Sequence, residues 1–261
     1  MPEFVTTETH GPVLVVTMNR PEAYNAVHAA MHHEMDAIWN DFRDNPELWV
    51  AILTGAGDKA FCAGNDLKAS AQAAASGTRQ APIPDTGFAG LSKRFDLDKP
   101  IIAAVNGFAM GGGFETALSC DIILGAERST YALPEVKVGF FAATGGVQRL
   151  SRYMSPTKAA ELLFTGRHMN AAEALSHGIL NAVHPDDALM DAAMGLAQEI
   201  AAQAPSSVRA TKKVLNALER EALDGSLAYS YDVLAELMTT EDHREGVTAF
   251  AEKRKPNWVN R

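Results

Sequence analysis

Two short apolar runs flank a stretch with helical spacing in the first quarter of the chain. Val13 to Met18 is β-branched and apolar, and Val50 to Leu53 forms a second run of the same kind. Each run is closed by turn-forming residues, which predicts two buried strands. Between them, residues 29–42 carry apolar side chains at intervals of three and four, which predicts an amphipathic helix. The predicted order is strand, helix, strand.

The same alternation recurs in the middle of the chain. Ile101 to Val105 is a short apolar run that predicts a strand, and a glycine-rich turn follows it. Phe114 to Ser119 has helical character, and Asp121 to Leu124 predicts another strand. Strands that alternate with helices favour an α/β domain with largely parallel strand pairing.

Helical patterns dominate after Pro156. Asn170 and Glu173 form a capping box for one short helix, which Gly178 closes. The other predicted helices cover residues 157–164, 186–202, 206–220, 227–238 and 241–253. Residues 69–86 are small and polar, which predicts a surface loop or a frayed helix. We therefore expect a core at residues 1–200 and a C-terminal helical region at residues 201–261.

Composition narrows the class of protein. The chain has 261 residues, 47% of them hydrophobic, which suits one or two globular domains. Its net charge of −9 disfavours a nucleic-acid partner, because phosphate binding requires clustered Lys and Arg. Two cysteines are too few for a disulfide framework. No apolar run approaches a membrane span and no signal peptide is evident, so we expect a cytoplasmic protein without a membrane partner.

Three consecutive glycines join a predicted strand to a predicted helix. Gly111, Gly112 and Gly113 follow the strand at 101–105, and Glu115 lies in the first helical turn. Amide groups at a helix N-terminus carry partial positive charge, so this segment can stabilise an oxyanion. The segment is not a dinucleotide fingerprint or a P-loop, because it lacks both consensus patterns. Glu115 either acts beside the bound oxyanion or only complements the helix dipole.

Two further segments contain another possible set of amide donors and another carboxylate. Phe61 to Leu67 follows a strand and exposes the amides of Ala63 and Gly64, which adds a second possible oxyanion donor. Glu135 lies in a loop after a short strand, ahead of a Gly-Gly pair at 145–146. The alternatives are a solvated loop acid at position 135 and a plain helix-start turn at 145–146.

Metal ligation and thiol chemistry are weakly supported. His28 and His32 lie one helical turn apart but lack the intervening Glu of a zinc protease, so we predict no metal site and no cofactor. Cys62 adjoins the possible oxyanion donors, but no His lies near it in the sequence. We interpret Cys62 as a small buried filler.

Taken in order, these motifs resemble the crotonase, or enoyl-CoA hydratase/isomerase, superfamily, and the similarity extends from Asn19 to Arg254. The resemblance implies an α/β fold, a crotonase-like ββα spiral core with a C-terminal helical trimerisation region. It also implies a homotrimer or a dimer of trimers. Within the superfamily, residues 87–91, 95–100, 111–115, 131–135 and 250–254 are most similar to the carnitinyl-CoA dehydratase branch.

The resemblance also assigns roles to individual residues. The amides of Ala63 and Gly112 would form the oxyanion hole for a thioester carbonyl, and Glu115 and Glu135 would be the paired catalytic glutamates. The aromatic residues that would line the acyl pocket, or cage a trimethylammonium group, are Phe88, Tyr131, Phe140 and Phe141. The residues that would surround coenzyme A, which belongs to the substrate, are Ala23, Ala26, Ala63, Gly64, Asn65, Asp66, Leu67, Lys68 and Gly111.

The leading hypothesis is reversible addition of water to a 2-enoyl-CoA thioester. Glu115 would activate the water and Glu135 would protonate the α-carbon, while the two amides stabilise charge on the carbonyl oxygen. Within the superfamily the alternatives are carnitinyl-CoA dehydratase and enoyl-CoA isomerase. From another class comes a non-catalytic acyl-CoA-binding or RNA-binding protein of the same fold. A hydrolase with a serine or cysteine nucleophile would require a His beside the oxyanion donors.

Overall fold

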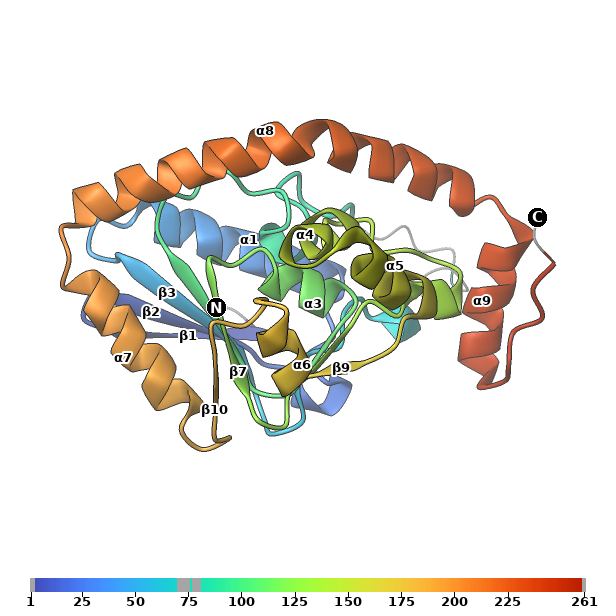
Figure 1. Ribbon diagram of the computed structural model, residues 1–261, viewed down its shortest axis with the longest axis horizontal. Coiled ribbons are helices and arrows are strands. Elements are labelled where there is room, and N and C mark those ends of the chain that lie inside the picture. Colours follow the sequence, from blue (N-terminus) through green and yellow to red (C-terminus); the bar gives the residue numbers. More distant parts are fainter. Residues whose placement is uncertain (1–2, 70–75, 77–80, 260–261) are drawn as a thin grey trace.

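A six-stranded sheet forms the centre of the molecule (Figure 1). The computed structural model describes residues 3–69, 76 and 81–259. The strand order is β1-β2-β3-β5-β7-β10, and only the β1–β2 pair in this sheet is antiparallel. The strands are β1 (Val5–His10), β2 (Val13–Met18), β3 (Val50–Gly55), β5 (Ile101–Val105), β7 (Ile122–Ala126) and β10 (Ala182–His184). The expected α/β class with largely parallel pairing is confirmed.

Side chains alternate between two cores on either face of this sheet. Val13 and Val15 pack on one face with α7 (Leu189–Ala201), whereas Leu14 and Val16 pack on the other face with α1 (Ala29–Asp44). Because both faces are covered, the strands need apolar residues at every position, which explains their unbroken hydrophobic runs.

A second sheet has four strands, and the segments that follow its strands contain the candidate functional residues. Its order is β4 (Ala60–Cys62), β6 (Phe108–Met110), β8 (Thr130–Ala132) and β9 (Met169–Asn170). The first three strands are parallel to one another. The chain passes from β5 directly into β6 through Gly107, where a Cβ would overlap the carbonyl oxygen of Lys59. This close passage requires glycine and explains the turn in the sequence.

Short helices and turns surround the small sheet. The turns are η1 (Pro21–Ala23), η2 (Phe88–Gly90) and η3 (Glu135–Val138). The helices are α3 (Gly112–Ala117), α4 (Gly146–Tyr153), α5 (Pro156–Thr165), α6 (Ala171–Ser176) and α9 (Glu241–Glu252). The Asn170 side chain accepts a hydrogen bond from the Glu173 amide, so the predicted cap of α6 is confirmed. Of the loop predicted at residues 69–86, positions 70–75 and 77–80 lie outside the described residues.

A single long helix replaces two predicted ones. Helix α8 runs from Pro205 to Leu237 and spans the length of the molecule (Figure 1). We predicted a break between residues 220 and 227, and this was wrong. Gly225 costs a helix interior about 1 kcal/mol. Burial of Leu223 and Leu227 on either side of Gly225 outweighs that cost.

Charged side chains attach α8 to the core. Lys212 donates hydrogen bonds to the Lys99 carbonyl oxygen and to the Asp121 carboxylate, at 2.6 and 2.8 Å. Asn216 donates to the Leu97 carbonyl oxygen at 2.9 Å. These contacts and the buried leucines hold the helix against the body of the molecule. No helix in the described part of the chain is long and apolar enough to cross a bilayer.

Candidate active site

The three parallel strands of the small sheet end at one edge, and each is followed by a segment singled out in the sequence. Residues 63–67 follow β4, the glycine run and Glu115 follow β6, and Glu135 follows β8. The carboxyl ends of parallel strands meet on one side of a sheet, which is where ligands bind in many α/β proteins. Segments that lie more than 70 positions apart in the chain are thereby brought together.

The glycine run forms the start of α3 with little space for side chains. Gly111 has a φ of 54°, which favours glycine, and its amide donates to the Ala132 carbonyl oxygen of β8. A Cβ on Gly113 would overlap the Cys62 carbonyl oxygen, and one on Gly112 would lie 2.5 Å from the Phe88 ring. The backbone therefore approaches its neighbours closely, and the Gly112 amide lies at a helix N-terminus, where no intrahelical acceptor exists.

Glu115 points from α3 to the start of α4. Its Oε1 accepts hydrogen bonds from the amides of Thr144 and Gly146, at 2.9 and 2.8 Å, and its Oε2 accepts from the Thr144 hydroxyl. The carboxylate is buried, and the N-terminus of α4 faces it. The carboxylate of Glu115 thus has a fixed position and three donors that favour its ionised form.

Glu135 follows β8, and its carboxyl group is enclosed. Its Oε1 lies beside Gly111, and its Oε2 is buried without a hydrogen-bond partner among the described residues. Buried polar atoms normally have partners, so an unpaired oxygen at this place suits an atom that meets a substrate. The residue as a whole is half-buried, and only its carboxyl end is enclosed.

The two glutamates differ in their protonation chemistry. Burial raises the pKa of Glu115, but the hydrogen bonds from Thr144 and Gly146 oppose this rise. Burial, and then the neighbouring Glu115, raises the pKa of Glu135 to about 8. At neutral pH Glu135 is therefore the member of the pair that holds a proton, while the hydrogen bonds to Glu115 favour the ionised form of that carboxyl group. This is the division that an acid and a base require.

The expected oxyanion donor at Ala63 needs correction. The Ala63 amide donates a hydrogen bond to the Tyr24 carbonyl oxygen at 3.0 Å, so it is not available to a substrate oxygen. Asn65 forms a parallel bridge with Val27, in which the Gly64 carbonyl oxygen accepts and the Asp66 amide donates. Because amides alternate in direction along an extended segment, the Asn65 amide points away from Val27.

The expected coenzyme A segments lie beside each other. Arg20 donates to the Ala26 carbonyl oxygen at 2.5 Å and pairs with Asp66 at 3.0 Å, which joins residues 23–26 to residues 63–67. Gly64 lies next to Gly111 and Gly112, because a Cβ at position 64 would be 2.7 Å from the Met110 carbonyl oxygen. Lys68 is exposed. The structure places these residues together, and their contacts with a ligand remain predictions.

The four expected pocket aromatics do not form one group. Phe88 lies over Gly112 and contacts the His32 ring edge to face, with ring centroids 4.6 Å apart. Phe140 packs against His243 of α9, and Phe141 is half-buried. Tyr131 was assigned wrongly, because it lies in the core and its hydroxyl is 2.9 Å from that of Ser129. Its side chain is fully enclosed by neighbouring residues, which leaves no surface on it for an acyl chain to contact.

Cys62 has the properties of a packing residue. It is fully buried, its sulfur accepts from the Gly64 amide at 3.4 Å, and burial raises the pKa of its thiol to about 12. A nucleophilic cysteine requires a lowered pKa. Among the described residues, no group of three or more His, Cys, Asp or Glu side chains converges on a possible metal position.

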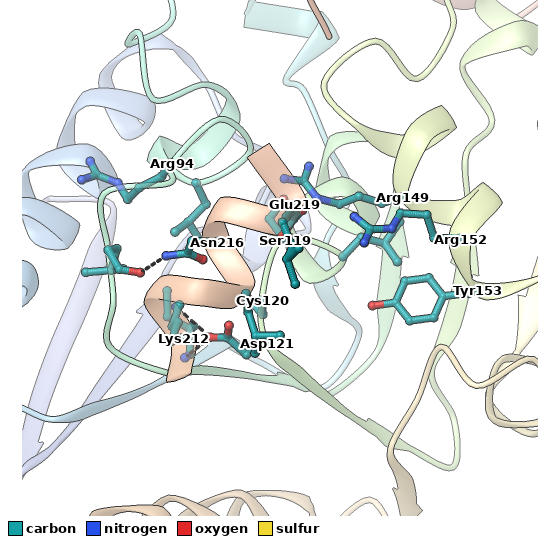
Figure 2. A pocket seen from close by; sticks show the side chains of 16 residues that line it. Arg94, Ser119, Cys120, Asp121, Arg149, Arg152, Tyr153, Lys212, Asn216 and Glu219 are labelled. Atoms are coloured by element: carbon teal, nitrogen blue, oxygen red, sulfur yellow. Dashed lines mark hydrogen bonds and ion pairs between the residues drawn. The ribbon is translucent and has the colours of Figure 1, made fainter. Parts of the chain in front are cut away.

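The cavity beneath α8 is separate from the glutamates. It measures about 390 Å³ and lies between the first half of α8 and the far ends of α3 and α4. Figure 2 shows Arg149 and Glu219 near each other at its wall, where they form an ion pair of 2.8 Å, and Lys212 beside Asp121. Its polar groups largely pair with one another, so this cavity belongs to the attachment of α8.

Sequence analysis missed the groups that surround Glu115. Thr144 was given no role, and a plain helix-start turn was one interpretation of Gly145 and Gly146, yet Thr144 and Gly146 both donate to the Glu115 carboxylate. A Gly-Gly pair before a helix was a signal for anion binding, as it was at residues 111–113. Nothing in the sequence indicated that the second helix faces the first.

Comparisons with known proteins show relatives over the whole length of the chain. The family model described as "Enoyl-CoA hydratase/isomerase" matches residues 8–261. A protein of Citrobacter koseri named carnitinyl-CoA dehydratase is 45% identical, with both chains covered completely. The crystal structure of carnitinyl-CoA hydratase from Mycobacterium avium is 40% identical, with a TM-score of 0.90 and 99% of each chain covered. An enoyl-CoA hydratase structure from Mycobacterium tuberculosis H37Rv is 36% identical, with a TM-score of 0.77 over the full length of both chains.

Proposed function

The chain belongs to the enoyl-CoA hydratase/isomerase family and is a lyase of the hydratase type, and we propose that it adds water to a 2-enoyl-CoA thioester by using Glu115 and Glu135. The main support for the proposal is the arrangement of Glu115 and Glu135. Two buried carboxyl groups lie at one sheet edge beside a helix N-terminus, and their environments separate their protonation states.

Each residue has a distinct task in the proposed reaction. Ionised Glu115, held by Thr144 and Gly146, takes a proton from water as the oxygen attacks the β-carbon. Protonated Glu135 delivers its proton from the enclosed carboxyl group to the α-carbon. In dehydration the two residues exchange roles, so the pair holds one proton in either direction.

The amides of Gly112 and Asn65 are the proposed oxyanion donors. The Gly112 amide lies at the start of α3, and the amide of Asn65 is directed away from Val27. A Cβ on Gly64, which precedes Asn65, would be 3.2 Å from the Gly112 nitrogen, so the two segments adjoin. Each donor in comparable sites contributes about 3–4 kcal/mol to transition-state stabilisation.

The direct test is loss of the conjugated thioester absorbance when the protein is mixed with crotonyl-CoA. We expect rapid loss with formation of 3-hydroxybutyryl-CoA, identified by mass spectrometry as a gain of one water. Movement of the double bond without a gain in mass would instead indicate an isomerase. Binding of the thioester with neither change would contradict catalysis and leave a binding protein of this fold.

Carnitinyl-CoA dehydratase is the second candidate activity. The observation in its favour is 45% identity over complete chains to a protein of that name. The same assay with crotonobetainyl-CoA, whose acyl group carries a trimethylammonium group, compares the two substrates directly.

Hydration should lose rate as the pH rises through about 8. Glu135 must be protonated to supply the α-proton, and burial with the neighbouring Glu115 raises its pKa to about 8. Above that pH Glu135 is ionised and cannot act as the acid, so kcat/KM for crotonyl-CoA hydration falls about tenfold for each further pH unit. The measurement is the pH profile of kcat/KM between pH 6 and 10, because this ratio reports groups of the free enzyme. A rate that is level to pH 10 would contradict Glu135 as the acid.

We also propose assembly into a trimer or a dimer of trimers. Val214, Leu215 and Leu218 on α8 are 61, 55 and 57% exposed, and exposed apolar side chains that are neighbours on one helix favour a protein partner. With the assembly that the family resemblance implies, sedimentation equilibrium should give three or six times the chain mass. A monomer at micromolar concentration would contradict the proposal.

A further inference from the structure

A lysine and a tyrosine from distant parts of the chain form a cation–π contact. Lys93 follows η2, and Tyr231 lies on α8. The Lys93 ammonium is 3.5 Å from the centroid of the Tyr231 ring, well within the range of this interaction. Neither residue has a part in the chemistry described above.

Helix α4 holds the neighbours of both residues. Arg149 donates to the Ser92 carbonyl oxygen at 2.9 Å, and Ser92 directly precedes Lys93. Gln148 donates to the Ser230 hydroxyl at 2.7 Å, and Ser230 directly precedes Tyr231. Two consecutive side chains of α4 thus hold the residues that precede Lys93 and Tyr231, one through a backbone carbonyl oxygen and the other through a side-chain hydroxyl.

The same helix binds the catalytic base. The amide of Gly146 at the start of α4 donates to Glu115. On the other side, Ser92 accepts from the amide of Phe88, whose ring covers Gly112. The Lys93–Tyr231 pair is thus connected through α4 to Glu115 and through Ser92 and Phe88 to Gly112. Burial, and to a lesser degree the charge of Glu115, raises the pKa of Tyr231 to about 12.

The charge at this place is only partly compensated. Burial lowers the pKa of Lys93, and Asp85 opposes this effect by its charge. The Tyr231 ring offers the ammonium a face with negative potential but no net charge. A second cation that approached this place would be repelled by Lys93 and would find the aromatic face already occupied.

We propose that Lys93, seated on Tyr231, selects the acyl group by charge: it disfavours acyl chains with a cationic end and favours neutral or anionic ones. This inference rests on the proposed function, because it assigns the substrate class of the same site. It separates the chain from relatives named for a carnitinyl substrate, whose acyl group is cationic.

Binding measurements test the charge selection independently of turnover. The probes are butyryl-CoA and its 4-trimethylammonio derivative, which are saturated and cannot be hydrated. If the cationic end were held about 6 Å from the Lys93 ammonium, two unit charges at an effective dielectric constant of ~20 would change the affinity by about 100-fold. We therefore expect wild-type protein to bind butyryl-CoA about 100-fold more tightly, as measured by isothermal titration calorimetry.

Variants at position 93 should change this ratio. Lys93→Met keeps the length of the side chain without the charge, and should reduce the ratio of dissociation constants to within about tenfold of unity. Lys93→Glu should reduce it further or reverse it. Lys158→Met is the matched control, because Lys158 is an exposed lysine on α5 that lies 3.5 Å from Glu161. Thermal melts by circular dichroism verify that each variant is folded.

The outcomes separate the two proposals. Equal affinity of wild-type protein for the two thioesters would overturn charge selection, and so would a ratio that Lys93→Met leaves unchanged. An equal change in Lys158→Met would also overturn it, because net charge would then explain the effect. No hydration of crotonyl-CoA together with the expected ratio would contradict the proposed function alone.

Discussion

Replacement of Glu115 or Glu135, the proposed catalytic residues, by glutamine is expected to lower kcat for crotonyl-CoA hydration by at least about 100-fold. Glu135→Gln removes the proton that the α-carbon receives, and Glu115→Gln removes the acceptor for the proton of water. Binding of butyryl-CoA should change by less than about threefold in Glu135→Gln, because the amide has nearly the shape of the neutral acid. Stopped-flow absorbance at the conjugated thioester band gives kcat, and calorimetry gives the dissociation constant.

The two variants should differ in stability, which separates their roles. Three donors point at the Glu115 carboxylate, so a neutral Gln amide at this position loses charge-assisted hydrogen bonds and must use the Thr144 hydroxyl as an acceptor. We expect Glu115→Gln to lose about 1–3 kcal/mol of unfolding free energy. Glu135 has an oxygen without a partner, so Glu135→Gln should lose nothing.

The unfolding free energy measured at several pH values gives an independent test of the raised pKa of Glu135. Burial raises its pKa from 4.5 to about 8, so the unfolded chain releases this proton first as the pH rises. The favourable contribution of Glu135 is complete below pH 4.5 and is lost towards pH 8. A glutamine at position 135 does not ionise, so Glu135→Gln keeps the free energy of unfolding that wild type loses. At pH 8 the variant should therefore be more stable than wild type in urea unfolding. A kcat within about threefold of wild type in either glutamine variant would contradict the catalytic assignment.

Gly112→Ala is expected to lower kcat by about 100-fold, because the added methyl group has no space. Its Cβ would lie 2.5 Å from the Phe88 ring, which is itself held against His32. Either the ring or the start of α3 must shift, and the Gly112 amide shifts with the helix. A displacement of about 1 Å in a reacting geometry costs about 100-fold in rate. The measurement is kcat with crotonyl-CoA, compared with the affinity for butyryl-CoA.

Gly195→Ala is the matched control for this substitution. Gly195 lies within α7, and a Cβ there meets nothing within 4 Å. The same methyl group should leave kcat unchanged and raise the unfolding free energy by up to about 1 kcal/mol, since alanine is the better helix former. A normal kcat in Gly112→Ala, with the protein folded, would show that the amide of Gly112 does not need its present position.

Predictions from local pattern succeeded where burial alone decides the structure. The strands at 13–18 and 101–105 were predicted with their observed bounds, because a strand covered on both faces must be apolar throughout. The cap at Asn170 was also predictable, because its hydrogen bond spans only three residues. The long helix α8 was not, because its continuity through Gly225 depends on packing against distant parts of the chain.

The structure brings together some of the predicted site residues, and their catalytic roles stay predictions. The glycine run and both glutamates were recognised from their sequence context and from the family resemblance, and they meet at one sheet edge. The donor at Ala63 was wrong because its amide bonds to Tyr24, 39 positions away in the chain. Tyr131 was wrong because the side of a strand that faces the core is set by the pairing of that strand.

The sequence by itself determined the class of fold, the helix N-terminus at Gly112, the two carboxylates and, through resemblance, the family. These features depend on local backbone geometry and on the order of apolar and polar residues, both of which are visible along the chain. Only the tertiary structure decided that Thr144 and Gly146 hold Glu115, that burial beside Glu115 keeps Glu135 protonated, and that Lys93 meets Tyr231. Such contacts join residues 20 to 138 positions apart. Their partners are set by strand register and helix packing, which no short segment of sequence encodes.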